Sequence, residues 1–137
     1  MYIIIAGCGR LGSNLAKKLA DAGHDVCVFD REGDKLSNLG SGFNGKRMKG
    51  IEYDNDNLLE GGIETADVLL AVTPDDNINL TVCMIASQIY HVPSIIGRVN
   101  NPAKTYLYDA LDITTINPVE TEIAIVQSLI VNKEMKL

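Results

Sequence analysis

A glycine-rich segment close to the N-terminus has the residue types and the spacing of a phosphate-binding loop. Residues 7–12 read Gly-Cys-Gly-Arg-Leu-Gly, a GxGxxG motif that follows an apolar run and precedes a helical pattern. In such a motif Gly7 permits a tight turn, Gly9 leaves room for a pyrophosphate, and Gly12 lets the helix lie against the strand. The N–H groups and the dipole at the start of that helix favour a phosphate. The segment predicts nucleotide binding; the alternative is a purely structural turn.

An acidic residue follows the motif at the separation expected for a ribose ligand. Asp30 closes the second apolar run, close to the ~20 residues that separate the glycines from the ribose-binding acid in dinucleotide-binding domains. Its carboxylate would accept the ribose hydroxyls and repel a 2′-phosphate, which favours NAD over NADP, although the adjacent Arg31 could offset that preference. Cys8 lies inside the loop. We interpret it as a space-filling residue, with redox sensing as the alternative.

The elements that must position these residues alternate along the chain. The apolar run of residues 2–6 predicts a buried strand, and Leu11, Leu15 and Leu19 recur every four residues, which predicts a helix. Further strands are predicted at residues 26–29, near 47–49, and at 68–72, 94–96 and 113–116. Further helices are predicted at residues 34–39, 78–89, about 102–110 and about 118–130. This alternation predicts an α/β fold with a doubly wound parallel sheet, a single Rossmann-type domain over residues 1–137.

Three later junctions between a strand and a helix carry polar clusters that imitate a catalytic site. They are the segments Thr73-Pro74-Asp75-Asp76, Asn101-Pro102 and Asn117-Pro118-Val119-Glu120. Each offers a capping residue followed by a proline in the first helical turn, so capping by Thr73 and the two asparagines explains them. Since these junctions share one sheet edge with the glycine loop, Thr73 and Arg98 could also line the nucleotide site. No catalytic residue is predicted.

Composition limits the remaining function classes. The chain has 137 residues, about one domain, with a formal net charge of -6 that disfavours binding to nucleic acid or anionic lipid. No apolar run reaches the ~18 residues of a membrane span, and the chain opens directly into a strand pattern, so we expect a cytoplasmic protein. The three cysteines form no CxxC motif, and neither histidine has a partner spaced for metal binding, so no disulfide or metal site is predicted.

Four segments together resemble a known family of regulatory domains. Residues 7–30, GCGRLGSNLAKKLADAGHDVCVFD, are joined by residues 61–80, GGIETADVLLAVTPDDNINL, by residues 95–102, IIGRVNNP, and by residues 114–124, TTINPVETEIA. This set resembles the N-terminal domain that regulates the conductance of potassium channels and of Trk/Ktr-type uptake systems, the N-terminal RCK domain. The resemblance covers nearly the whole chain.

The resemblance implies a function and a set of binding residues. A domain of this kind is a cytosolic regulatory subunit that assembles into dimers and rings beneath a membrane pore and binds NAD(H) or ATP/ADP to set its conductance. The resemblance places the phosphates on the loop, Asp30 at the ribose, Thr73 at the middle of the ligand and Arg98 at the distal phosphates. The implied loop residues are Gly7, Gly9, Arg10, Leu11 and Gly12.

The sequence departs from the family pattern in three places. Gly50-Ile51-Glu52 stands where the family has Gly-Asp-Ala near the adenine, which leaves adenine recognition open. Val119 replaces the acid that in many members joins an intersubunit cation site, so no cation is expected there. Many relatives continue into a second ligand-binding domain. The chain is therefore a fragment or a short subunit that needs a partner chain.

Two function classes lead, ahead of other nucleotide-binding adaptors. The first is a regulatory subunit of a potassium transporter or channel, peripheral to the inner face of the membrane through its partner. The alternative is an NAD-dependent oxidoreductase or its cofactor domain, but hydride transfer needs a substrate pocket and usually an acid or base facing the nicotinamide, and nothing in the sequence supplies them.

The last predicted helix indicates how the chain would assemble. It carries two apolar stripes, of which a single sheet contact would bury only one. The first stripe consists of Val119, Ile123, Val126 and Ile130, and the second of Ile125, Leu129 and Val131. Because the resemblance implies that late helices pack against a neighbouring subunit, we predict a homodimer or larger assembly through this helix. The alternative is a deeply buried core helix.

Overall fold

A six-stranded parallel sheet in the order β3-β2-β1-β4-β5-β6 forms the centre of the computed structural model, which describes residues 1–135. The strands are β1 (Tyr2–Ala6), β2 (Asp25–Asp30), β3 (Lys46–Lys49), β4 (Val68–Ala71), β5 (Ser94–Arg98) and β6 (Thr114–Ile116). The strand order reverses between β1 and β4. This is the topology of a doubly wound Rossmann-type sheet, so the predicted fold class is confirmed.

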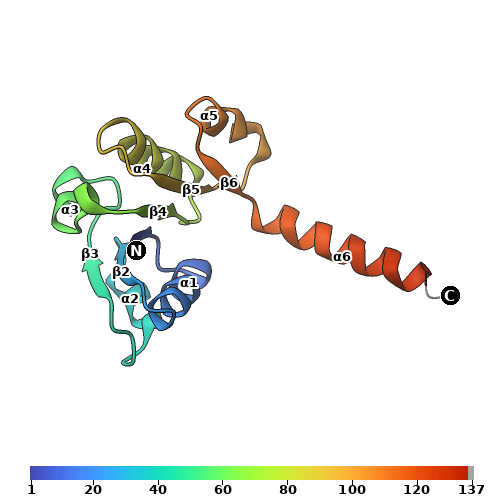
Figure 1. The fold of residues 1–137 in the computed structure, drawn as a ribbon, viewed down its shortest axis with the longest axis horizontal. Helices are drawn as coiled ribbons and strands as arrows, with labels where there is room; N and C mark the ends of the chain where they lie inside the picture. The colour runs from blue at the N-terminus through green and yellow to red at the C-terminus, as the bar shows by residue number, and fades with distance from the viewer. Residues whose placement is uncertain (136–137) are drawn as a thin grey trace.

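Helices cover both faces of this sheet (Figure 1). The α-helices are α1 (Arg10–Asp21), α2 (Gly33–Leu36), α3 (Asn55–Glu60), α4 (Asp76–Gln88), α5 (Thr105–Asp109) and α6 (Pro118–Met135), and the 3-10 turns are η1 (Ser37–Leu39), η2 (Ile63–Thr65) and η3 (Pro102–Lys104). Side chains of β1 alternate between two cores: Ile4 packs in the core beneath α3, α4 and α5, whereas Ile3 and Ile5 pack in the core beneath α1 and α2. The unbroken apolar run of this central strand follows from burial on both faces.

The segment between β3 and β4 contains an element that the sequence pattern did not predict. Helix α3 begins after Asp54, whose carboxylate accepts a hydrogen bond of 3.1 Å from the N–H of Asn57. Only Leu58 of this helix is buried. A helix of six residues with one buried side chain has too short an apolar pattern for its periodicity to be recognised. Strand β5 also extends two residues beyond its predicted end, to Arg98.

The last helix does not pack on the sheet as expected. Helix α6 extends away from the sheet and the other helices (Figure 1), and its seven apolar side chains in both stripes are between 49% and 61% exposed. The expectation that one stripe contacts the sheet was wrong, and a buried core helix is excluded within the described residues. Asn117 alone separates β6 from α6, which leaves no loop to turn the helix back over the sheet.

Candidate functional site

The glycine loop connects β1 to α1, and two of its glycines are required by its geometry. Gly7 has φ of +111°, and a Cβ atom there would lie 2.9 Å from the backbone nitrogen of Thr73. A Cβ atom on Gly12 would lie 1.9 Å from the carbonyl oxygen of Gly7. A side chain at position 7 would push the loop away from the end of β4. A side chain at position 12 would push α1 away from the loop. Both glycines therefore have the structural roles that the motif predicted.

Gly9 differs from its two neighbours because nothing in the fold requires it. Its φ of -75° suits any residue, and a Cβ atom there would meet no atom within 4 Å. Gly9 is the N-cap of α1, and no side chain in residues 1–135 caps the N–H groups of that first turn. The helix start thus presents unclaimed N–H donors beside open space, the arrangement that a phosphate group needs.

The three side chains between the loop glycines lie in different environments. Arg10 is exposed at the start of α1, whereas Leu11 is half-buried and packs against the core beneath α1 and α2. The thiol of Cys8 is fully buried, and burial together with the nearby Asp30 raises its pKa to about 11. A thiol with this pKa is protonated at neutral pH, so the structure favours the space-filling interpretation of Cys8 over redox sensing.

Asp30 ends β2 beside the loop and is only 5% exposed. Its carboxylate accepts hydrogen bonds from the N–H of Cys8, at 2.9 Å, and from the N–H of Glu32, at 2.8 Å. One carboxylate therefore ties the glycine loop to the turn that enters α2. Because two carboxylate oxygens offer about four acceptor sites, Asp30 retains capacity for a ribose hydroxyl.

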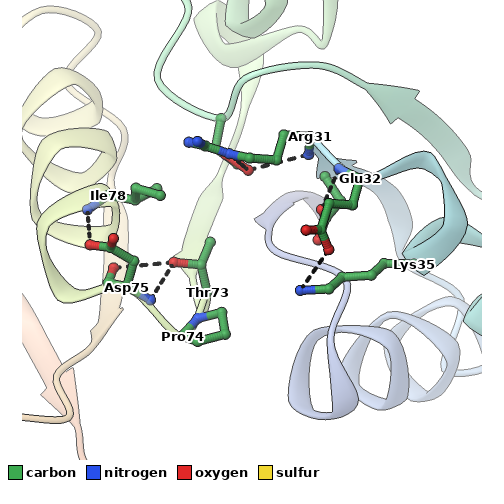
Figure 2. Close-up of a pocket in the computed structure, with 9 residues that line it drawn as sticks. Arg31, Glu32, Lys35, Thr73, Pro74, Asp75 and Ile78 are labelled. Atoms are coloured by element: carbon green, nitrogen blue, oxygen red, sulfur yellow. Dashed lines mark hydrogen bonds and ion pairs between the residues drawn. The ribbon is translucent and has the colours of Figure 1, made fainter.

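A cleft of about 440 Å³ opens at the carboxyl ends of β2 and β4, the two strands that flank β1, and no residue of the glycine loop is among those that line it. Figure 2 shows Arg31, Glu32 and Lys35 facing Thr73, Pro74 and Asp75 across it. Its lining comprises Asp30, Arg31, Glu32, Lys35, Glu52, Thr73, Pro74, Asp75 and Ile78. The structure thus brings together three predicted site residues, Asp30, Arg31 and Thr73, at the point where the strand order reverses. Clefts of this size and position bind small ligands in doubly wound sheets.

Thr73 is held by a buried residue that the sequence did not single out. The side-chain oxygen of Asn79 accepts hydrogen bonds from the N–H and the hydroxyl of Thr73, at 2.9 and 2.7 Å, and its amide donates to the carbonyls of Thr73 and Arg98. Asn79 is fully buried in α4. A polar residue inside an apolar helical pattern was the only signal that could have identified it. Its effect is to fix the end of β4 against the end of β5.

Arg98 lies outside the residues that line this cleft. Its Nε donates a hydrogen bond of 2.9 Å to the side-chain oxygen of Asn100, and only its carbonyl is linked to Thr73 through Asn79. A role for Arg98 at a distal phosphate therefore stays a prediction.

The predicted caps are found with one correction. Helix α4 is capped by Asp75, whose carboxylate accepts from the N–H groups of Asn77 and Ile78, and not by Thr73. Thr73 lies two residues too early because the turn through Pro74 delays the helix to Asp76. Asn101 and Asn117 act as predicted, since their side chains accept from the N–H groups of Ala103 and Glu120.

Arg31 and Glu52 form an ion pair at the outer wall of the cleft. The Nε of Arg31 lies 3.0 and 3.1 Å from the two carboxylate oxygens of Glu52, and the guanidinium carbon lies 5.7 Å from the centre of the Tyr53 ring. The Glu52 residue is 2% exposed. Glu52 stands in the segment where, by the resemblance, the sequence departs from the family pattern, and in the structure it is a buried partner for Arg31.

Two further features of the described chain bear on function. Residues 1–135 contain no group of three or more His, Cys, Asp or Glu side chains that could hold a metal ion. No helix within the same residues is long and apolar enough to span a membrane.

Comparisons with known proteins single out one family. The family model described as the TrkA-N domain matches residues 3–118. The chain is 40% identical over 116 residues to the Trk system potassium uptake protein TrkA of Streptomyces coelicolor, which covers 85% of this chain and 52% of that protein. The chain thus spans about half the length of this curated relative.

Solved structures share the fold. The TrkA-N domain of the inner membrane protein ybaL from Escherichia coli superposes with a TM-score of 0.82 at 18% identity, over 94% of this chain and 95% of that one. GsuK bound to ADP superposes with a TM-score of 0.80 at 20% identity, over 96% of this chain and 34% of that one. At these identities the likeness establishes the fold alone.

Proposed function

Since the chain belongs to the TrkA-N domain family, we propose that it is the nucleotide-sensing regulatory domain of a potassium uptake transporter or channel, binding NAD(H) or ATP/ADP to control ion conductance. Its relative in Streptomyces coelicolor is a potassium uptake protein, which supports the transport context. In this proposal the domain itself carries out no reaction. It acts on the inner face of the membrane through its partner.

The observation that carries the proposal is the open, uncapped start of α1 beside the cleft. Phosphate groups would occupy the space at Gly9 and accept hydrogen bonds from the N–H groups of the first helical turn. The ribose hydroxyls would donate to Asp30, and the chain of the ligand would pass Thr73. That the similarly folded GsuK was solved with ADP supports an adenine nucleotide as the ligand.

Calorimetry tests this directly. Purified protein titrated with NADH, NAD, ATP, ADP and AMP is expected to show saturable binding of at least one of them, with the ranking of the five identifying the physiological class. The 2′-deoxy analogue of the best ligand serves as a control. It should bind more weakly because it offers Asp30 one hydroxyl fewer. Absence of binding by all five nucleotides would overturn the proposal.

An oxidoreductase role is disfavoured by the state of the titratable groups at the cleft. Asp30 accepts from two N–H groups, Arg31 pairs with Glu52, Lys35 lies 3.2 Å from a carboxylate oxygen of Glu32, and Asp75 caps α4. Each group that could exchange a proton with a substrate is already engaged. This supports the regulatory proposal over the oxidoreductase alternative.

We therefore expect no oxidation or reduction of small alcohols, hydroxy acids or aldehydes with either nicotinamide cofactor. The absorbance of the reduced nicotinamide follows the reaction, and turnover of about 1 per second would be typical of an enzyme. Such turnover would replace the regulatory proposal by the oxidoreductase alternative.

The proposed regulation requires assembly, for which α6 supplies the surface. A helix that exposes two apolar stripes is normally covered by another chain. We propose a homodimer or larger symmetric assembly through α6, joined to a membrane transporter or channel subunit and to a second ligand-binding domain or chain. Nucleotide-dependent shifts at the cleft would reach the partner through β6, which leads directly into α6.

A further inference from the structure

Arg31 stands where a 2′-phosphate-binding arginine would be expected, but the Nε of its guanidinium is engaged by a buried carboxylate. In dinucleotide-binding domains an arginine near the ribose accommodates the 2′-phosphate of NADP. Here the guanidinium donates from Nε to both oxygens of Glu52, and the backbone N–H of Arg31 donates to the same carboxylate at 3.3 Å. The Tyr53 ring lies against the guanidinium. These contacts direct the charge of Arg31 toward Glu52.

The burial of Glu52 makes this pairing difficult to exchange. Its side chain is 3% exposed, whereas that of Arg31 is 39% exposed. If Arg31 turned toward a ligand phosphate, Glu52 would remain as a buried carboxylate without its cationic partner, which is strongly unfavourable. A ligand that used Arg31 would therefore leave the buried carboxylate of Glu52 without a cationic partner.

The remaining charges of the cleft add to this effect. Its lining contains four carboxylates, on Asp30, Glu32, Glu52 and Asp75, but only two cations, on Arg31 and Lys35. Both cations are already paired, Arg31 with Glu52 and Lys35 with Glu32. A phosphate with a charge of about -2 at the ribose would therefore meet a net negative wall without a free cation.

We propose that Glu52 is a specificity-determining residue that withholds Arg31 from the ligand, so that the cleft accepts adenine nucleotides with an unmodified ribose and rejects 2′-phosphorylated ones such as NADP(H). This inference rests on the proposed nucleotide binding and assigns its ligand class. It also gives a role to the position at which the sequence departs from its family.

The test compares paired ligands on the intact chain by calorimetry: AMP with adenosine 2′,5′-bisphosphate, and NADH with NADPH. The parent protein is expected to bind the 2′-phosphorylated member of each pair at least about tenfold more weakly. The E52Q variant keeps the shape of the side chain but removes its charge, so that Arg31 loses its ion pair and its positive charge becomes available to a ligand. We expect the discrimination to fall by about tenfold through new binding of the 2′-phosphate, because charge-assisted bonds of arginine to phosphate are among the strong ones.

Two further variants show whether the gain in binding of 2′-phosphorylated nucleotides depends on Arg31. The double variant E52Q/R31A should restore the discrimination of the parent, because it has no guanidinium to release. The variant D75N removes a carboxylate of the same cleft that pairs with neither cation, keeps a side-chain oxygen to cap α4, and should leave the discrimination nearly unchanged. If E52Q does not fold, as judged by thermal unfolding, E52A provides the same neutralisation with a smaller side chain.

The outcomes separate this inference from the proposed function. Nucleotide binding by E52Q or E52A with the discrimination of the parent would overturn the role of Glu52 and leave nucleotide sensing intact. Equal gains in E52Q and D75N would also overturn it, since general charge would then explain the preference. Failure of the parent to bind any of these nucleotides would overturn the proposed function instead.

Discussion

Replacing Gly9 with alanine is expected to lower the affinity for adenine nucleotides tenfold or more while leaving the free energy of unfolding nearly unchanged. The backbone of Gly9 is compatible with alanine, and the added methyl group would meet no protein atom within 4 Å. It would instead occupy the space through which a pyrophosphate approaches the first turn of α1. Loss of one or two hydrogen bonds to a charged acceptor is about 1.5 to 3 kcal/mol each, and about 1.4 kcal/mol is a factor of ten in affinity. Calorimetry with the best-binding nucleotide measures the first effect, and denaturant unfolding measures the second.

Two other glycines provide matched controls for this variant. Gly42→Ala also adds a methyl group in open space, but away from the cleft, and should change neither affinity nor stability. Gly12→Ala should differ from Gly9→Ala by destabilising the fold, because its methyl group would collide with the carbonyl of Gly7 and lower stability by roughly 1 to 3 kcal/mol or more. Unchanged nucleotide affinity in Gly9→Ala would remove the loop from the binding site.

The variant Asp30→Ala is a less specific test of nucleotide binding than the sequence pattern predicts. The motif predicts that Asp30→Ala weakens binding and leaves the fold intact. In the structure that variant would also leave the N–H groups of Cys8 and Glu32 without their acceptor. Each buried donor that loses its partner costs about 1 to 3 kcal/mol. A loss of affinity in this variant could therefore come from the missing ribose contact or from displacement of the loop. Gly9→Ala is the better test because it leaves the fold unchanged.

Introducing charge on α6 is expected to convert an assembled protein into a folded monomer. In the double variant Ile125→Glu and Leu129→Glu, two side chains of the second stripe that are 56% and 58% exposed within the chain become carboxylates. Burying an unpaired carboxylate at an apolar interface is strongly unfavourable, so the subunits should separate. Because α6 contributes to neither core, nucleotide affinity and the unfolding transition of the domain should persist. Light scattering gives the mass, and calorimetry gives the affinity.

The control places the same charge on the same helix outside both stripes. Gln127→Glu with Ser128→Glu adds two carboxylates at exposed polar positions and should leave the assembly intact. Equal dissociation by both double variants would indicate a general effect of charge on the helix. A monomeric mass for the unmodified protein across micromolar concentrations would contradict assembly through α6 by this chain alone.

The sequence by itself determined the features that depend on local pattern. The alternation of short apolar runs with four-residue periodicity was sufficient for the fold class, because strands and helices bury residues at different intervals. The roles of Gly7 and Gly12 were also predictable, since each follows from a turn or a close contact within one strand, one loop and one helix. Asp30 was placed at the cleft by its separation from the motif, which a unit of strand, helix and strand keeps nearly constant.

Only the tertiary structure decided the features that join segments distant in sequence. Glu52 meets Arg31 because β2 and β3 are neighbours in the sheet, and Asn79 joins Thr73 to Arg98 because α4 crosses between β4 and β5. No local periodicity reports such pairs. The exposure of α6 was also undecidable from its composition, since an apolar helix is equally consistent with a buried core and with an uncovered interface. The direction in which the chain leaves β6 settles that choice, and this direction is a property of the whole sheet.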